Sequence, residues 1–293
     1  MASTPRPQPR LIGLSKLGGA QAVPRLDASR LEAQQLDTRA KELGHFVVHR
    51  TLKPDEVARL THEISESVLK HSRVMQGPNF TSTTVADLQR MAELYDAKFF
   101  DARVLSLARK HGMSFRWSSR MTSAGGKTIR FTHSPRGSRA RQVTYEIALS
   151  ATLLFQTFGD LERPIRVTGY NCTNRMQAMQ RILEHELVHL AEMLAWDDSN
   201  CAACRFQSIA NRFFGHTEHK HDLVTQQERA AKKYNIRVGS MVTFAHEGRS
   251  YIGKVNRITR RATILVVDPT GQRYEDGKCY RKFYVPLAHL RAV

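Results

Sequence analysis

Two histidines and a glutamate in the stretch His185-Glu186-Leu187-Val188-His189 have the residue types and spacing of a metal-dependent hydrolase centre. Histidines four residues apart lie on one face of a helix, so both can bind one divalent ion while the glutamate reaches its bound water. Apolar residues recur at three- and four-residue steps from Met176 to Trp196, without proline or glycine, which predicts that helix. The pattern favours a zinc site over the alternative, two hydrogen-bonded histidines without a metal. His185 and His189 would bind zinc, and Glu186 would activate a zinc-bound water.

Composition limits the class of protein and of partner. The chain has 293 residues and 41% hydrophobic content, enough for two domains and a tail. Lys and Arg outnumber Asp and Glu by 45 to 27, a net charge of +18 that favours a polyanionic partner, with nucleic acid as the natural candidate. The alternatives for this charge are solubility or attraction to an anionic membrane. No apolar run could span a bilayer and no signal segment begins the chain, so we expect a cytoplasmic protein, associated with nucleoid or chromatin, and no membrane partner. Four scattered cysteines indicate reduced thiols.

The order of patterns predicts four regions. Residues 1–30 are rich in proline and basic residues and should form a flexible basic arm, and residues 31–90 should form packing helices, one opened by Pro54 and another near Leu88. Strands are expected at residues 113–121, 127–133 and 145–149, with the second able to pair back on the first. The segment before the third strand is basic, with Lys127, Arg130, Arg136, Arg139 and Arg141, and is expected as a flexible positive loop on the side of the metal helix. The alternative is a merely solvated loop.

Residues 236–293 read as a small basic β-barrel. Short alternating segments are joined by tight turns, and eleven Lys and Arg stand against four Asp and Glu. Aromatic residues alternate with the basic ones, a composition suited to phosphate contacts and base stacking. The alternative is that the aromatics form the barrel core and the charges are merely solvated. Candidate nucleic-acid-binding residues are Lys254, Arg257, Arg260, Arg261, Arg281 and Lys282. The segment weakly resembles KOW- or Tudor-type, SH3-like barrels.

Several motifs in order resemble the SprT-like metalloprotease family, which includes the Spartan proteases. They are Tyr95-Asp96-Ala97-Lys98-Phe99-Phe100, the stretch from Phe115 to Gly126, Ile147-Ala148-Leu149-Ser150, the HExxH segment, and the run from Arg205 to Gly215. The resemblance covers roughly residues 90–222, within a domain expected over 91–235. It implies a small sheet, the HExxH helix, zinc, and a third ligand at the start of the next helix. It also implies proteolysis of proteins crosslinked to DNA, hence a role in DNA repair, with DNA favoured over RNA.

The chain departs from the family pattern at the third ligand. Where the family has His-Gly four residues before the helix aromatic, this chain has Ala202-Ala203, which cannot bind a metal. Cys201 is the nearest donor, near the expected helix start where the dipole favours a thiolate. Cys204, His216 and Asp197 or Asp198 remain alternatives. A thiolate ligand would leave less positive charge on the site and acidify the bound water less.

The sequence therefore predicts an α+β protein: a SprT-like zinc metalloprotease domain after N-terminal helices, followed by a small all-β barrel. Its substrate would be a protein associated with nucleic acid. Another class stays open, a nucleic-acid-binding protein with a structural zinc site and no protease activity. A third is an adaptor that binds peptides through the barrel.

Overall fold

The computed structural model describes residues 25–134, 142–159 and 163–293. Arg136, Arg139, Arg141 and most of the expected basic arm lie outside these residues. The chain divides into two compact units after Thr38, and helix α1 (Arg25–His49) crosses that point. Residues 25–30, expected in the unfolded arm, instead begin this helix. Leucine, alanine, glutamate and glutamine dominate the segment up to Leu43, and all favour helix.

The next two helices form where the sequence predicts them, and a third, α4 (Arg103–His111), was not predicted. Helix α2 (Pro54–His71) has its proline in the first turn and buries one apolar face that includes Ile64. Helix α3 (Val85–Phe99) begins with a capping box between Thr84 and Asp87. Helix α4 follows α3 after a short turn.

A three-stranded sheet supports the HExxH helix. Strands β1 (Met113–Ser118), β2 (Gly126–His133) and β3 (Gln142–Ser150) lie in the order β1-β3-β2. The expected pairing of 127–133 with 113–121 is wrong, because β3 lies between them, parallel to β1 and antiparallel to β2. Residues 147–149 of β3 are almost fully buried, whereas β1 alternates between half-covered and exposed residues and the second half of β2 is exposed, so the most apolar strand takes the centre.

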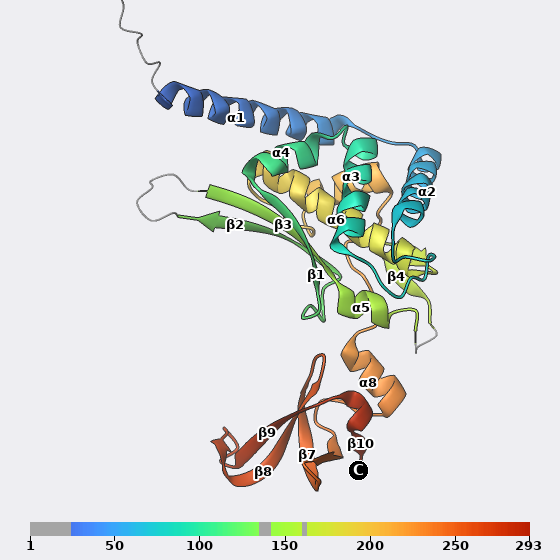
Figure 1. Cartoon of the computed structure of the whole chain (residues 1–293), viewed down its shortest axis with the longest axis vertical. Helices are drawn as coiled ribbons and strands as arrows, with labels where there is room; N and C mark the ends of the chain where they lie inside the picture. The colour runs from blue at the N-terminus through green and yellow to red at the C-terminus, as the bar shows by residue number, and fades with distance from the viewer. Residues whose placement is uncertain (1–24, 135–141, 160–162) are drawn as a thin grey trace, which may run out of the picture. The chain divides into compact units, whose positions relative to one another are not determined.

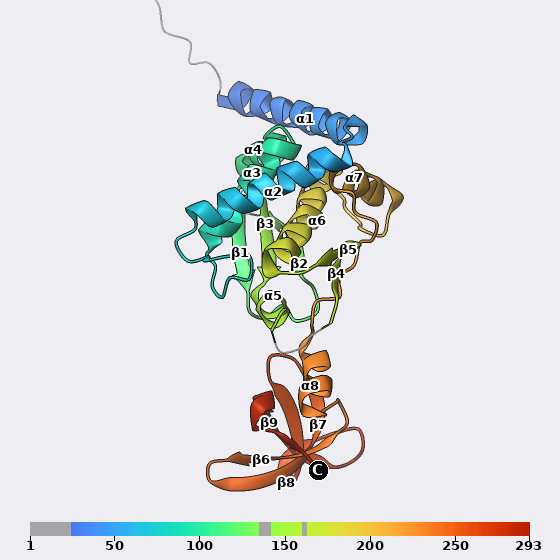
Figure 2. The ribbon, with the colours of Figure 1, turned by 90° about the vertical axis from the view of Figure 1, so that its right-hand side faces the viewer.

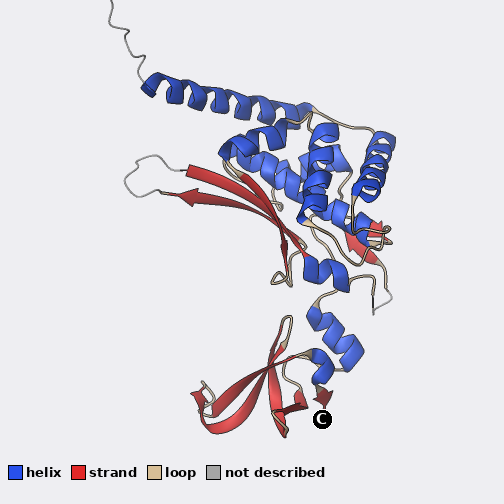
Figure 3. Ribbon diagram, viewed as in Figure 1, coloured by secondary structure: helices blue, strands red, loops and turns tan. Residues whose placement is uncertain are grey.

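Helices cover one side of this sheet. Helix α6 (Arg175–Trp196) packs against β2 and β3, and α4 packs against β1 and β3 (Figures 1 and 3). Short elements connect them: α5 (Ala151–Gln156) and the hairpin β4 (Ile165–Val167) and β5 (Tyr170–Cys172). Helix α7 (Cys204–Phe214) then packs on α6. Its Phe213 also stacks on Phe100 at the end of α3, with 4.8 Å between ring centroids. Helix α6 therefore lies between the three-stranded sheet and helix α7.

The C-terminal part is rich in strands, which confirms the mixed α+β class. After α8 (Gln226–Tyr234) come β6 (Met241–His246), β7 (Arg249–Ile258), β8 (Ala262–Arg273), β9 (Cys279–Val285) and β10 (Arg291–Ala292). They form one sheet in the order β10-β6-β7-β8-β9, antiparallel throughout. Figure 2 shows β6, β7, β8 and β9 below helix α8. We call residues 236–293 the C-terminal sheet. Its own core includes Val242, Phe244, Val255, Ile264 and Phe283.

Candidate metal centre

Helix α6 presents His185 and His189 on one face, one turn apart. Asn174 caps the helix by accepting a hydrogen bond from the Gln177 amide, and most residues around the two histidines are buried. The two Nε2 atoms lie 3.1 Å apart. Tetrahedral zinc with nitrogen ligands at 2.0–2.1 Å places two such nitrogens about 3.3 Å apart, so the pair has the spacing of two ligands to one ion.

A buried relay fixes the tautomer of His189. Glu192 is fully buried and accepts hydrogen bonds from Ser199 Oγ at 2.6 Å and from Arg205 Nε at 2.7 Å. Since the only hydroxyl hydrogen of Ser199 goes to Glu192, its oxygen must accept from His189 Nδ1, 2.7 Å away. The Nδ1 atom therefore carries the proton, and Nε2 keeps the lone pair that a metal needs.

Burial keeps both rings neutral. It lowers the pKa of His189 to about 4. Burial is also the main reason that the pKa of His185 falls to about 2, with smaller contributions from His189 and three histidines of the 216–221 segment. His185 Nδ1 is buried without a hydrogen-bond partner among the described residues. Neutral imidazoles are the form that binds metal.

Cys201 completes a group of three possible ligands. It lies in the turn between α6 and α7, where Asn200 accepts hydrogen bonds from the amides of Ala202 and Ala203, both at 2.9 Å. Its sulfur and one nitrogen from each of the two histidines lie within 4.8 Å of one another. Within the described parts of the chain, this is the group of three donors that could hold a metal ion. Two neutral imidazoles and a thiolate suit zinc, and other soft divalent ions are compatible with them.

The structure does not bring the other candidate ligands into this group. Cys204 is the exposed first residue of α7. His216 is buried elsewhere, with Nε2 2.8 Å from a carboxylate oxygen of Glu184. Asp197 ends α6, and both it and Asp198 are largely exposed.

Glu186 lies beside the ligands in a tight pocket. The residue is 4% exposed, and Thr128 Oγ1 of β2 directs its one hydrogen at Glu186 Oε2, 2.8 Å away, and at the Glu186 carbonyl, 2.9 Å away. Only a glycine at position 126, at the start of β2, leaves space for the Glu186 carboxyl group, because a Cβ atom there would lie 2.5 Å from Glu186 Oε1. Burial raises the pKa of Glu186 to about 7, against the lowering effect of the Thr128 hydrogen bond. A carboxyl group with a pKa near 7 can both accept and return a proton at neutral pH.

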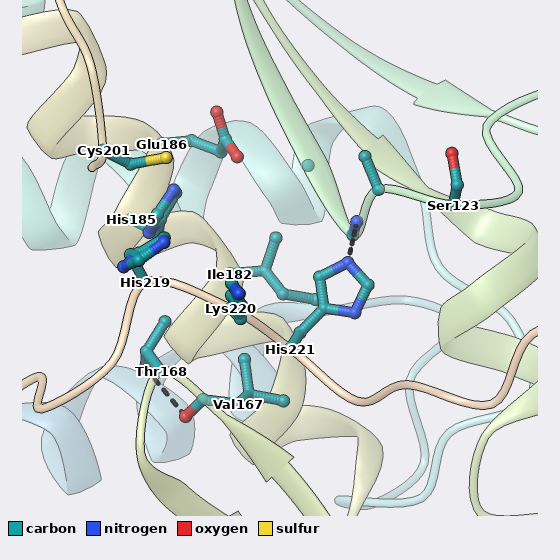
Figure 4. A pocket seen from close by; sticks show the side chains of 13 residues that line it. Ser123, Val167, Thr168, Ile182, His185, Glu186, Cys201, His219, Lys220 and His221 are labelled. Atoms are coloured by element: carbon teal, nitrogen blue, oxygen red, sulfur yellow. Dashed lines mark hydrogen bonds between the residues drawn. The ribbon is translucent and has the colours of Figure 1, made fainter.

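His185, Glu186 and Cys201 line a cleft of about 380 Å³ (Figure 4). The loop from Ser123 to Gly126 forms one wall, and residues 219–221 face it. His221 connects the two walls, because its Nε2, on the 219–221 segment, accepts a hydrogen bond from the Gly125 amide of the facing loop at 2.7 Å. Sequence reasoning missed the roles of Ser199, Glu192 and this wall. The glycine pair Gly125-Gly126 and the alternating histidines at 219 and 221 were the available signals.

The candidate nucleic-acid-binding residues are all exposed on the C-terminal sheet. Lys254 and Lys282 flank Leu265 in register across three strands, which places them on one face about 10 Å apart. Arg260 and Arg261 lie in the β7–β8 turn and Arg257 close to it. Arg281 pairs with Asp268 at 2.9 Å. The structure therefore brings the two lysines onto one face and places three arginines at one turn.

The aromatic residues of this sheet divide between core and surface. Phe283 is buried in the core and Tyr251 packs against it. For these two residues, the alternative that the aromatics form the core holds. Tyr284 is 64% exposed. Tyr274 and Tyr280 are half-buried and meet edge to face, with Lys282 Nζ 5.3 Å from the Tyr274 ring centroid.

No family model, curated protein or solved structure matches the chain. None of the described helices is both long and apolar enough to cross a bilayer.

Proposed function

We propose that the chain is a zinc-dependent protease of the SprT-like type, acting on proteins bound or crosslinked to nucleic acid. The observation that carries the proposal is the group of three ligands beside buried Glu186 at an open cleft. Structural zinc sites use four protein ligands and are closed, whereas catalytic sites use three and keep one position open. Three donors, of which His185 and Cys201 line a cleft of about 380 Å³, fit the catalytic kind.

The sheet offers a place for a peptide. Strand β2 is an edge strand of the three-stranded sheet, and its first residue, Gly126, lines the cleft. An extended peptide can add to such an edge through main-chain hydrogen bonds. This supports a protein substrate, whose scissile bond would reach the cleft beside Glu186.

The residues of the site would have separate roles in metal binding and in proton transfer. Zinc, when bound, would polarise the water and the peptide carbonyl. His185, His189 and Cys201 would hold it, and the Glu192–Ser199 relay keeps His189 in the binding tautomer. Glu186 takes the proton of the attacking water and passes it to the leaving amine. Thr128 holds one oxygen of Glu186, which leaves the other for the proton.

Nucleic acid remains part of the proposal through the C-terminal sheet, which we assign to the SH3-like barrels of KOW or Tudor type. Lys254 and Lys282 share a face, and the nearby Tyr284 ring is exposed for stacking. DNA is preferred to RNA because the proposed family acts on DNA-bound proteins. A cytoplasmic location with nucleoid or chromatin association follows from the same proposal.

The Glu186→Gln variant tests the protease mechanism. It should keep stoichiometric zinc, measured by elemental analysis, and lose cleavage of a protein crosslinked to DNA, because an amide cannot accept the proton. Equal cleavage by wild type and variant would refute the mechanism. A wild-type protein that binds zinc and DNA without cleaving any crosslinked protein would instead support the alternative, a nucleic-acid-binding protein with a structural metal.

A further inference from the structure

Three histidines follow α7, and two of them use Nε2 in a hydrogen bond with the protein. His216 Nε2 is occupied by Glu184, and His221 Nε2 accepts from the Gly125 amide. His219 lines the cleft together with His185 and Glu186. Figure 4 shows it on the chain segment that forms the facing wall. It lies outside the group of three ligand atoms.

The backbone around His219 is anchored. Thr168 donates its amide hydrogen to the Lys220 carbonyl at 2.9 Å, and Asp222 donates its own to the Arg166 carbonyl at 2.9 Å. These bonds pair the segment with β4 and fix it as the cleft wall. A side chain held on such a wall needs little reorganisation to meet a substrate.

Gln207 sets which ring nitrogen of His219 carries a proton. The Gln207 amide nitrogen lies 3.4 Å from the Cys201 carbonyl and 3.3 Å from the Ala202 carbonyl, so this end of the amide must be the NH₂ donor. The same nitrogen is 3.5 Å from His219 Nδ1, so Nδ1 can accept the second NH₂ hydrogen while the two carbonyls share the first. In the neutral ring the proton is then on Nε2, the atom left for the cleft.

We propose that His219 is a catalytic residue, whose Nε2 hydrogen bonds to the carbonyl oxygen of the scissile peptide as that oxygen becomes negative. The inference rests on the proposed protease function. The water oxygen bonds to the carbonyl carbon, the carbonyl electron pair moves to its oxygen, and Glu186 takes the water proton. When the carbon–nitrogen bond breaks, Glu186 returns that proton to the amine. His219 keeps its proton throughout.

The test uses the full-length, zinc-loaded protein and a protein–DNA crosslink as substrate. His219→Phe keeps a planar ring but removes the donor, and should lower kcat by about 10²–10³-fold with little change in KM. His219→Gln, which supplies an amide donor, should recover part of the rate. Glu218→Gln, an exposed change on the same segment, is the matched control and should leave kcat unchanged.

Two further measurements separate this role from metal binding. All variants should keep stoichiometric zinc, and the visible absorption of the cobalt-substituted protein should be the same in the wild type and in His219→Phe. Loss of zinc or an altered cobalt spectrum in His219→Phe would make His219 a ligand and overturn the inference. An unchanged kcat in that variant would overturn it while the protease function stands. A wild-type protein without cleavage would overturn both.

Discussion

Ser199 should control zinc affinity although it cannot reach the metal itself. In the Ser199→Ala variant, His189 Nδ1 loses its acceptor at 2.7 Å and Glu192 loses the donor at 2.6 Å. The ring is then free to turn, or to place its proton on Nε2, and both changes remove the lone pair from the metal position. The fold should persist, because Arg205 still neutralises the buried Glu192 carboxylate.

The size of the effect follows from the position of the relay. Removing the hydrogen-bond partner of a metal-bound histidine typically costs 10–100-fold in metal affinity, about 1.4–2.8 kcal/mol of binding free energy. Both bonds of this relay are short, and its carboxylate end is fully buried, so water replaces it poorly. We therefore expect a loss near the upper end of that range.

Zinc affinity can be measured by competition with a chromophoric chelator. Ser199→Thr keeps the hydroxyl and should bind zinc nearly as well as the wild type. Ser208→Ala, which removes a hydroxyl from the exposed face of α7, is the matched control. An affinity of Ser199→Ala equal to that of the wild type would refute the relay as the determinant of the His189 tautomer.

Three further predictions concern the third ligand, the base and the C-terminal sheet. Cys201→Ser should weaken zinc binding strongly, measured by the same competition, because a serine hydroxyl replaces the thiolate at the ligand position. Gly126→Ala should abolish cleavage, since its Cβ would lie 2.5 Å from Glu186 Oε1 and 2.7 Å from its Cγ. Replacing Lys254 and Lys282 together by alanine should weaken DNA binding and reduce its dependence on salt, measured by titration at several ionic strengths.

Each of these has a matched control. Cys204→Ser should leave zinc affinity unchanged, and a larger loss there than in Cys201→Ser would move the ligand to Cys204. Gly125→Ala meets its nearest neighbours only at 3.1 Å and should cost less activity than Gly126→Ala. Lys110→Ala removes an exposed lysine of α4, so a salt slope reduced equally by this change would show that the C-terminal sheet has no special role.

Local patterns predicted most elements, whereas long-range pairing was not predictable. The face of α2 that includes Ile64 and the mixed polar and apolar runs of the strands carry their own periodicity. The parallel pairing of β1 with β3 leaves no periodic pattern in the sequence, because it depends on which strand the helices bury. Helix α1 was missed at its start because the basic residues there resembled the preceding arm.

The candidate site shows the same division. The spacing of His185 and His189 reveals itself in the sequence, since one turn of helix makes them neighbours. Ser199 becomes a partner of His189 only because Asp197 ends α6 in a left-handed conformation, with φ of 57°, and the chain turns back. Gly126 gains its meaning only from the approach of Glu186. Polar contacts made across a turn or between elements leave no periodic pattern in the sequence, so they could not be predicted from it.

Metal binding and ionisation of Glu186 should be coupled. Without metal, burial raises the pKa of Glu186 to about 7, so the carboxyl is largely protonated at pH 6 and largely ionised above pH 8. A zinc ion with one thiolate and two neutral imidazoles keeps one positive charge, and a positive charge nearby favours the carboxylate. Zinc binding should therefore release a proton from Glu186 in addition to the one that the Cys201 thiol must lose.

Calorimetry in buffers of different ionisation enthalpy measures that release. We expect more than one proton per zinc at pH 6.5 and a smaller number at pH 8.5, where Glu186 is already ionised. In Glu186→Gln the Glu186 share should disappear at pH 6.5, while the release from Cys201 persists. The same release in wild type and variant at pH 6.5 would mean that zinc binding does not change the ionisation of Glu186, and it would refute the coupling.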